Sequence, residues 1–328
     1  MPCGSRRGAG PHSLRAVREI VVFGGSAHPA LSEEICDHLG VPLYPVRLSR
    51  FANDCLEVQL QANCRERDVF VIQPLGPPVQ ENLVELLLML DAARGASAAR
   101  VTAVIPYYSY ARSDKKSMPR VSIGGRLVAD LLVTAGASRV LAMTLHSPQV
   151  HGFFSIPVDH LNALREFADH FARLDLSNAV VVSPDLGNAK NAAALARLLQ
   201  LPVAAGAKER FSDERVMISS IIGDVEGRYV IVLDDEIARG TTIIELLDRL
   251  RERDARSVRI ACTHGLFSDG ALKRIAAQPL VQEIVTTNTL PTAEAGPDLQ
   301  VISIAAALAE AIRRIHEGES VSALFGAS

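Results

Sequence analysis

Two adjacent acids, Asp234 and Asp235, precede a Gly-Thr-Thr triplet at 240–242. An apolar, β-branched run at 229–233 leads into the acids and is typical of a buried parallel strand, whereas residues 242–250 have the apolar spacing of a helix. Backbone N–H groups at a helix N-terminus, beside a glycine and hydroxyl groups, can bind phosphate. The carboxylates can accept hydrogen bonds from vicinal hydroxyls or hold a hydrated divalent cation. A sugar phosphate would satisfy both halves of this segment; the alternative is an ordinary strand-to-helix turn with an acidic cap.

Other reactive side chains also follow expected strands. The segment 106–116 combines hydroxyls, aromatic rings and cations, which suits a nucleotide polyphosphate with Arg112 meeting phosphate, or else forms a solvated charged loop. His146 leaves its strand at the carboxyl end, where open α/β sheets bind ligands, so it is a candidate metal or phosphate contact. Asp185 and Lys190 flank a glycine at another strand-to-helix junction, a position suited to phosphate and cation.

Two further segments are less specific. The Gly-Gly-Ser turn at 24–26 precedes a helix and either holds an anion or is simply a tight turn. The charged segment 207–215 lacks apolar periodicity, so we expect a mobile loop or a hairpin there.

Strands and helices alternate along the chain, which indicates an α/β fold. The expected strands are 19–23, 45–50, 56–60, 69–73, 101–105, 139–144, 179–183, 229–233 and 258–262. The expected helices are 30–39, 79–94, 123–135, 163–174, 191–199 and 242–250.

The two halves of the chain repeat each other. Residues 68–105 and 229–262 share the order strand, loop, helix, strand, and only the second copy carries the acid pair. We therefore expect a duplicated α/β domain, with an N-terminal domain at 18–162 and a C-terminal domain at 163–328. Residues 1–17 are rich in Gly, Ser and Arg, and we expect them to be a disordered extension.

Composition narrows the class of protein. The net charge of −3 offers no broad basic field, so nucleic acid is not an expected partner. No apolar run is long enough to cross a membrane and no secretory signal is evident, so we expect a soluble, cytoplasmic protein without a membrane partner. The odd number of cysteines, without paired metal-ligand spacing, indicates reduced and mostly buried thiols.

Taken together, these segments resemble the ribose-phosphate diphosphokinase (phosphoribosyl pyrophosphate synthetase) family. The resemblance spans about 20–315 and rests on seven segments in order: GGSAHPALSEEI, RDVFVIQPLGPPVQENLVELLLMLDAAR, TAVIPYYSYARSDKK, LHSPQVHGFFSIPVDHL, VVSPDLGNAK, IIGDVEGRYVIVLDD and THGLFS. It implies two tandem phosphoribosyltransferase-type, Rossmann-like domains with mostly parallel central sheets. It also implies Mg²⁺-dependent transfer of the β,γ-diphosphate of ATP to the anomeric hydroxyl of ribose 5-phosphate, releasing AMP.

The resemblance also implies roles for particular residues. The expected ATP-binding residues are Phe51, Asn53, Arg112, Ser113, Asp114 and His146, with Phe51 and Asn53 lent by a neighbouring subunit of a homo-oligomer, a dimer or hexamer. The expected ribose 5-phosphate residues are Asp234, Asp235, Arg239, Gly240, Thr241 and Thr242. His146 and Asp185 match magnesium positions, and Lys208 and Arg210 match a catalytic basic pair on a flexible loop.

The chain departs from the family pattern in the sugar-phosphate segment. That segment commonly reads Asp-Asp, two residues, Asp-Thr, whereas here Ala238 and Arg239 replace the third acid and the first threonine. One carboxylate and one hydroxyl are therefore missing, and Arg239 either contacts the phosphate or crowds the pocket and changes the accepted sugar.

Other departures concern the nucleotide side and regulation. Cys55 stands where a glutamate commonly ends the adenine loop, so base selectivity is expected to relax. Ser117 and Met118 replace usually charged residues of regulated hexameric members, and Asn188 replaces a glycine beside Asp185.

These departures leave alternatives open to the working diphosphokinase. They are a non-catalytic partner that regulates a true synthetase, a paralogue acting on a modified pentose phosphate, and a phosphoribosyltransferase that uses the product.

Overall fold

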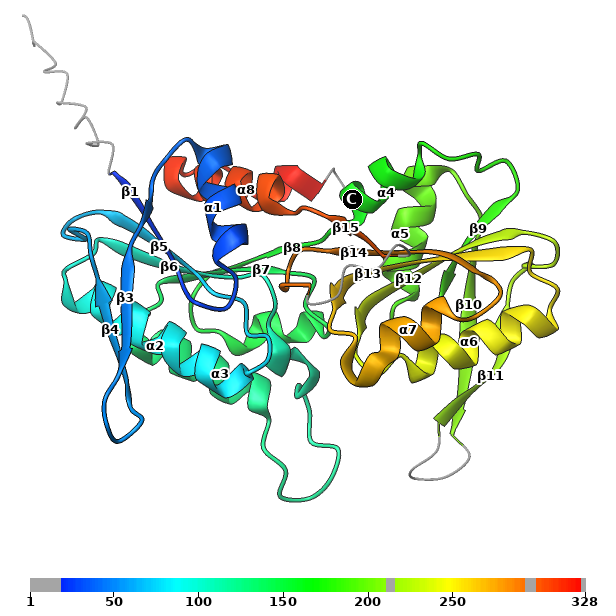
Figure 1. Ribbon diagram of the computed structural model, residues 1–328, viewed down its shortest axis with the longest axis horizontal. Coiled ribbons are helices and arrows are strands. Elements are labelled where there is room, and N and C mark those ends of the chain that lie inside the picture. Colours follow the sequence, from blue (N-terminus) through cyan, green and yellow to red (C-terminus); the bar gives the residue numbers. More distant parts are fainter. Residues whose placement is uncertain (1–18, 211–215, 293–298, 326–328) are drawn as a thin grey trace, which may run out of the picture.

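The computed structural model describes residues 19–210, 216–292 and 299–325. They form two α/β halves that lie side by side, each built on a sheet with helices on both faces (Figure 1). The expected α/β architecture with mostly parallel sheets is confirmed. The extension expected at 1–17 lies outside the described residues.

The first half contains a parallel sheet in the order β2-β1-β5-β6-β7-β8. Its elements are β1 (Ile20–Gly24), α1 (Pro29–Leu39), β2 (Leu43–Tyr44), β5 (Asp68–Ile72), α2 (Val79–Gly95), β6 (Arg100–Ile105), α3 (Gly124–Ala135), β7 (Arg139–Met143) and β8 (Val158–Leu161). Every residue of β5 is buried, because helices cover both faces of the sheet. No strand was expected from the sequence at the position of β8.

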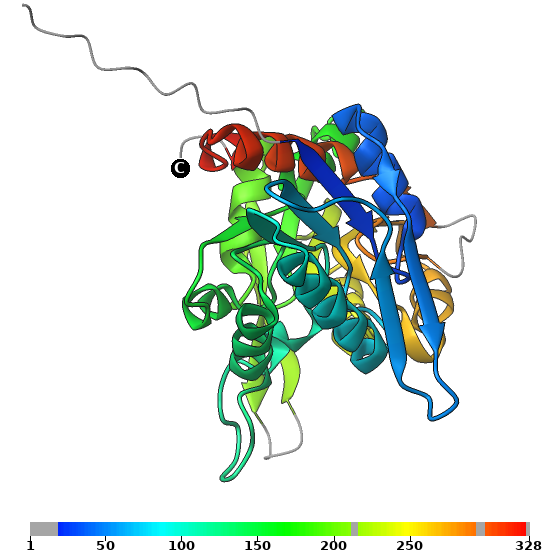
Figure 2. The same ribbon diagram turned by 90° about the vertical axis from the view of Figure 1, so that its left-hand side faces the viewer.

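A two-stranded antiparallel hairpin, β3 (Val46–Arg50) and β4 (Leu56–Leu60), forms a separate sheet in this half. Figure 2 shows it standing apart from the six-stranded sheet, with its turn pointing away from the strands. Both strands match the expected ranges closely. The turn carries Phe51 and Asn53, so these residues lie at the tip of a projecting arm.

The second half contains the sheet β11-β10-β9-β12-β13-β14-β15, which is parallel except for the antiparallel pair β10–β11. Its elements are α4 (Leu164–Phe171), β9 (Ala179–Ser183), α5 (Ala189–Leu199), β10 (Val203–Arg210), β11 (Val216–Ile222), β12 (Tyr229–Ile237), α6 (Thr241–Glu252), β13 (Ser257–Gly265), α7 (Ala271–Ala276), β14 (Val281–Thr287), β15 (Leu299–Ile302) and α8 (Ala305–Glu317). The first residues of the charged segment, 207–210, belong to β10, which pairs antiparallel with β11, so the hairpin that was one of the two expectations is confirmed for this part. Residues 211–215 lie outside the described part.

Strand β12 differs from the expectation in a way that matters for the site. The sequence places Asp234 and Asp235 in a loop after a strand that ends at residue 233, but the strand continues to Ile237. Pairing with β13 sustains it, because Asp234 lies opposite Cys262 and Glu236 lies opposite His264. The acids therefore have a fixed strand geometry in which successive side chains point to opposite sides.

The two halves share an apolar core. Helix α8 follows the last strand of the second sheet but packs against α1 of the first half (Figure 1). One continuous cluster of buried residues includes Phe70 from the first sheet, Ile231 from the second and Ile312 from α8. At the end of α8, His316 Nδ1 lies 2.9 Å from Oδ2 of the fully buried Asp68. Because the core crosses between the halves, the division at 162/163 stays a prediction.

Candidate active site

A pocket of about 900 Å³ opens between the two halves, where the carboxyl ends of β6 and β7 face those of β9 and β12. Open α/β sheets bind ligands at this edge. The pocket collects most of the residues that the sequence singles out, from four separate strand ends. They are Arg112, Asp114, His146, Asp185, Asp234, Asp235, Arg239, Gly240, Thr241 and Thr242.

The turn from β12 into α6 forms one wall of the pocket. Gly240 has a φ of +72°, a left-handed conformation that favours glycine, and it is the residue before the first turn of α6. No side chain caps this helix and its first turn carries no acidic residue, so the backbone N–H groups at its positive end face the pocket. A Cβ atom at position 240 would lie 2.8 Å from Cδ1 of Ile275. The turn therefore has the shape and the polarity of a phosphate site.

The acid pair lies beside this turn. Asp235 Oδ2 is 2.6 Å from Nδ1 of His146, which comes from the first half. Burial, together with the neighbouring Asp235, raises the pKa of Asp234 well above its usual value. Burial is the largest influence on Asp235 and would raise its pKa, but the hydrogen bond and charge of His146, together with the hydrogen bond to Asp234, outweigh burial and lower that pKa. The same hydrogen bond raises the pKa of His146. Two adjacent, poorly solvated carboxylates make a site that attracts a cation or hydroxyl donors.

Glu236 is part of this site, although sequence reasoning gave it no role. Its side chain is only 4% exposed, and Oε1 lies 2.8 Å from Nη1 of Arg112. The hydroxyl of Tyr107 donates to Oε2 at 3.2 Å. Burial, with the nearby Glu236, raises the pKa of Tyr107, so this phenol stays protonated as a donor. The run of three acids at 234–236 is the signal that could have drawn attention to Glu236.

The turn after β9 brings Asp185 to the pocket and explains one departure from the family pattern. Asn188 donates from its side chain to the carbonyl of Leu233 at 2.9 Å, and its backbone N–H donates to Asp185 Oδ1 at 3.1 Å. A glycine at 188 would lack the first of these bonds. Asn188 therefore fastens the β9–α5 turn to β12, next to the acid pair.

Three expected site residues whose side chains are described, Phe51, Asn53 and Ser113, do not line the pocket. Phe51, with a relative exposure of 54%, and Asn53 lie on the β3–β4 turn. Ser113 accepts a hydrogen bond from the backbone N–H of Gly124 at 2.9 Å, so its hydroxyl supports the start of α3. Lys208 and Arg210 are at the end of β10, and their side chains are outside the described part of the structure.

Arg239 lines the pocket but is bound to a neighbouring loop. Its Nε lies 3.3 Å from Oδ2 of Asp269, and its side chain is 77% exposed. Arg274 donates from Nη2 to the backbone carbonyl of Arg239 at 2.7 Å. The exposed pair is weak enough for an anionic ligand to displace Asp269.

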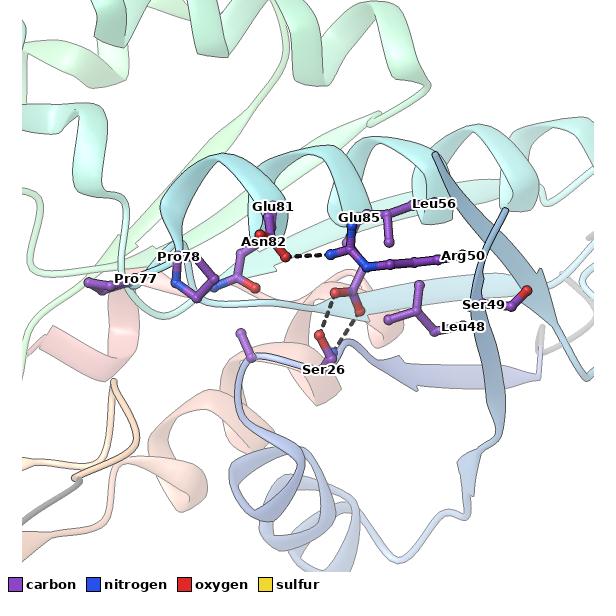
Figure 3. Close-up of a pocket in the computed structure, with 11 residues that line it drawn as sticks. Ser26, Leu48, Ser49, Arg50, Leu56, Pro77, Pro78, Glu81, Asn82 and Glu85 are labelled. Atoms are coloured by element: carbon purple, nitrogen blue, oxygen red, sulfur yellow. Dashed lines mark hydrogen bonds and ion pairs between the residues drawn. The ribbon is translucent and has the colours of Figure 1, made fainter. Parts of the chain in front are cut away.

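A second, smaller cavity of about 500 Å³ lies between the β3–β4 hairpin and the start of α2 (Figure 3). Its centre is Glu85, which is 3% exposed and accepts from the backbone N–H of Ser26 at 2.7 Å. The Ser26 hydroxyl donates to the same carboxylate. The Gly-Gly-Ser turn, one of whose two interpretations was anion binding, is thus already paired with an anion of the protein itself.

The large pocket offers carboxylate and imidazole groups that could bind a divalent cation. Within the described residues, no group of three or more His, Cys, Asp or Glu side chains is arranged to hold a metal ion. Mg²⁺ does not need such a cage, because it keeps several waters and is usually held by one or two carboxylates together with substrate phosphates. The raised pKa of Asp234 reflects unfavourable burial and like charge that a cation would relieve. The carboxylates of this pocket therefore fit Mg²⁺ bound jointly with a phosphorylated ligand.

No helix in the described ranges is both long and apolar enough to cross a membrane. Among the described cysteines, Cys36, Cys64 and Cys262 are buried and Cys55 is exposed on the hairpin turn.

Comparisons with known proteins match nearly the whole chain. Residues 20–136 match the N-terminal domain of ribose phosphate pyrophosphokinase, and residues 213–326 match the phosphoribosyl synthetase-associated domain. A putative ribose-phosphate pyrophosphokinase of Streptomyces coelicolor is 72% identical over 95% of this chain and 99% of its own length. The ribose-phosphate pyrophosphokinase of Deinococcus radiodurans is 49% identical over 93% of this chain and 98% of its own length.

A solved structure agrees with the sequence matches. The phosphoribosylpyrophosphate synthetase of Mycobacterium smegmatis superposes with a TM-score of 0.86 at 39% identity, covering 92% of this chain and 100% of that one.

Proposed function

Because the chain belongs to the ribose-phosphate pyrophosphokinase family, we propose that the pocket between its two halves is where it transfers the diphosphate. The enzyme joins the β,γ-diphosphate of ATP to the anomeric oxygen of ribose 5-phosphate and releases AMP. In this reaction the anomeric oxygen forms a bond to the β-phosphorus while the bond from that phosphorus to the α,β-bridging oxygen breaks. The observation that carries the proposal is that one pocket contains both the β12–α6 turn and the cationic segment around Arg112.

The ribose 5-phosphate half of the proposal rests on the β12–α6 turn. The first turn of α6, with Thr241 and Thr242, would bind the 5-phosphate through backbone N–H groups and hydroxyls. Asp234 and Asp235 would accept hydrogen bonds from the ribose hydroxyls. His146 supports this orientation because its hydrogen bond to Asp235 keeps that carboxylate ionised and fixed. Arg239 would leave Asp269 and reach the phosphate, which supplies charge where the family has a threonine.

The ATP half of the proposal lies across the pocket. Arg112 and Asp114 follow β6, and Arg112 presents the planar donor geometry that matches phosphate oxygens. Ser113 would contribute by holding the start of α3 in place. Phe51 and Asn53 would bind adenine in a neighbouring subunit, because their projecting hairpin lies outside the pocket of their own chain. This arrangement requires a homo-oligomer, a dimer or hexamer.

Mg²⁺ is the cofactor that these residues would hold, with His146 and Asp185 as the proposed protein positions. When bound, it neutralises charge on the polyphosphate and favours an in-line approach. Attack on a highly anionic nucleotide is limited by charge repulsion and by alignment, so fixed cations and donors supply most of the catalysis. Lys208 and Arg210 would add positive charge at the end of β10 and exclude water that would otherwise hydrolyse ATP. A cytoplasmic location fits a reaction that consumes ATP.

The test is a Mg²⁺-dependent assay with ATP and ribose 5-phosphate, in which AMP and the phosphoribosyl diphosphate product are followed by mass spectrometry. We expect stoichiometric AMP and product, and no product when Mg²⁺ is chelated. AMP without the sugar product would mean that water is the acceptor and would contradict the proposal. A panel of pentose phosphates in the same assay measures how far Ala238 and Arg239 change the accepted sugar.

A further inference from the structure

Glu236 connects the two halves at the active site. Its carboxylate belongs to β12 of the second half, but both of its oxygens bind partners of the first half: Arg112 at 2.8 Å and the Tyr107 hydroxyl at 3.2 Å. The adjacent Asp235 binds His146, which is also from the first half. Consecutive residues of one strand therefore contact the ends of both β6 and β7. A carboxylate that is 4% exposed is costly unless it is paired, and both oxygens of Glu236 have a partner.

The environment of Glu236 excludes a role in sugar binding. Along β12, residue 236 lies on the same side as Asp234 and alternates with Asp235. It therefore has the position of an extra acid near the site, in a chain that lacks the acid commonly found at 238. However, the carboxylate is nearly inaccessible and is used by Arg112 and Tyr107. It cannot replace the missing carboxylate toward a ribose hydroxyl, so its charge acts on the nucleotide side.

The contact leaves most of Arg112 available. Glu236 engages Nη1, and the arginine side chain remains 54% exposed in the wall of the pocket. A guanidinium has five N–H donors in a rigid plane, so fixing one nitrogen orients the others. A free arginine side chain loses rotamer entropy when it is ordered. With Glu236 in place, part of that cost is met before the ligand arrives.

We propose that Glu236 is a positioning residue for nucleotide binding, which holds Arg112 in the orientation that meets the polyphosphate of ATP. This inference rests on the proposed function of the pocket. Tyr107 helps to fix Glu236, because its hydroxyl donates to the second carboxylate oxygen. The Tyr107 ring in turn packs against His264 at a centroid distance of 4.8 Å.

The experiment measures binding of a non-hydrolysable ATP analogue with Mg²⁺ by calorimetry, in the full-length protein and four variants. Glu236→Gln keeps the shape of the side chain but loses its charge, and Arg112→Ala removes the positioned group. The double variant completes a double-mutant cycle, which measures the coupling between the two residues. Asp130→Asn is the matched control, because it weakens an exposed Arg–Asp pair on α3 instead. Ribose 5-phosphate binding and thermal unfolding of each variant check that the fold is intact.

We expect Glu236→Gln to weaken analogue binding about tenfold, since a charge-assisted hydrogen bond is about twice as strong as a neutral one. Ribose 5-phosphate binding should change less than twofold, and Asp130→Asn should match the parent protein. When Arg112 is already replaced by alanine, Glu236→Gln should not weaken analogue binding any further. In turnover, KM for ATP should rise more than kcat falls.

Three results would overturn the inference. Unchanged analogue binding by Glu236→Gln would mean that Arg112 is positioned without it. Tighter binding would mean that Glu236 only neutralises Arg112. A full loss that persists in the Arg112→Ala background would mean that Glu236 acts through the fold. Because these readouts are binding measurements, they remain decisive if the parent protein forms no phosphoribosyl diphosphate, which would count against the proposed function alone.

Discussion

Replacing Gly240 with alanine tests whether the β12–α6 turn must keep its observed shape. The residue has a φ of +72°, and a Cβ atom there would lie 2.8 Å from Cδ1 of Ile275, a fully buried residue of α7. The left-handed conformation costs a non-glycine residue about 1–2 kcal/mol. Forcing a methyl group into a packed interior costs about 1–3 kcal/mol. The sum is about 2–5 kcal/mol, divided between the stability of the protein and the affinity of the turn for phosphate.

This division can be measured. If the turn keeps its shape, the free energy of unfolding falls by the full amount while ribose 5-phosphate affinity stays near normal. If the turn relaxes instead, backbone N–H groups move away from the phosphate and affinity falls about tenfold for each 1.4 kcal/mol. Urea unfolding measures the first quantity and calorimetry with ribose 5-phosphate measures the second.

The matched control is Gly227→Ala. Gly227 has a φ of +64°, but a Cβ atom there meets no atom within 4 Å, so this variant carries the backbone strain without the clash. Ile275→Val removes the clashing Cδ1 atom, so it should recover part of the loss when combined with Gly240→Ala. The reasoning is refuted if Gly240→Ala loses no more stability than Gly227→Ala and binds ribose 5-phosphate normally.

Three further predictions concern other parts of the site. Asp235→Ala should abolish ribose 5-phosphate binding in calorimetry while circular dichroism stays unchanged; retained affinity would remove the acid pair from the sugar site. Lys208→Ala should lower kcat by orders of magnitude with little change in substrate affinity, because its charge would act mainly in the transition state; a fall in affinity at normal kcat would make this segment a binding element only. His264 is 2% exposed, and burial lowers its pKa to about 4. The unfolded chain therefore binds more protons than the folded one between pH 6.5 and 4, so acid destabilises the fold, by about 2 kcal/mol from pH 7 to pH 5 for this residue. In urea unfolding, His264→Gln should show a smaller loss over that interval by about this amount, and an equal loss would contradict the assignment.

The sequence by itself determined most of the local elements up to residue 262 and their order. Short β-branched runs such as those of β9 and β12 are typical of buried parallel strands, and apolar residues at three and four spacing predict a helix such as α2. The sequence also placed Arg112, His146 and Asp185 after the carboxyl ends of strands, where open α/β sheets bind ligands. Asp185 follows a strand of the second sheet, so its meeting with the other two depended on how the halves pack.

Only the tertiary structure decided which side chains those residues meet. Pairing with β13 carries β12 through the acids, and this pairing depends on a strand that comes later in the chain. The position of Glu236 against Arg112 depends on how the two halves pack, because the partners are separated by 124 positions in the sequence. The pairing of Ser26 with the carboxylate of Glu85 likewise joins segments that are far apart in the sequence. Sequence spacing fixes contacts within one helix, strand or turn, whereas contacts between distant segments follow from burial of the shared core, which no local pattern records.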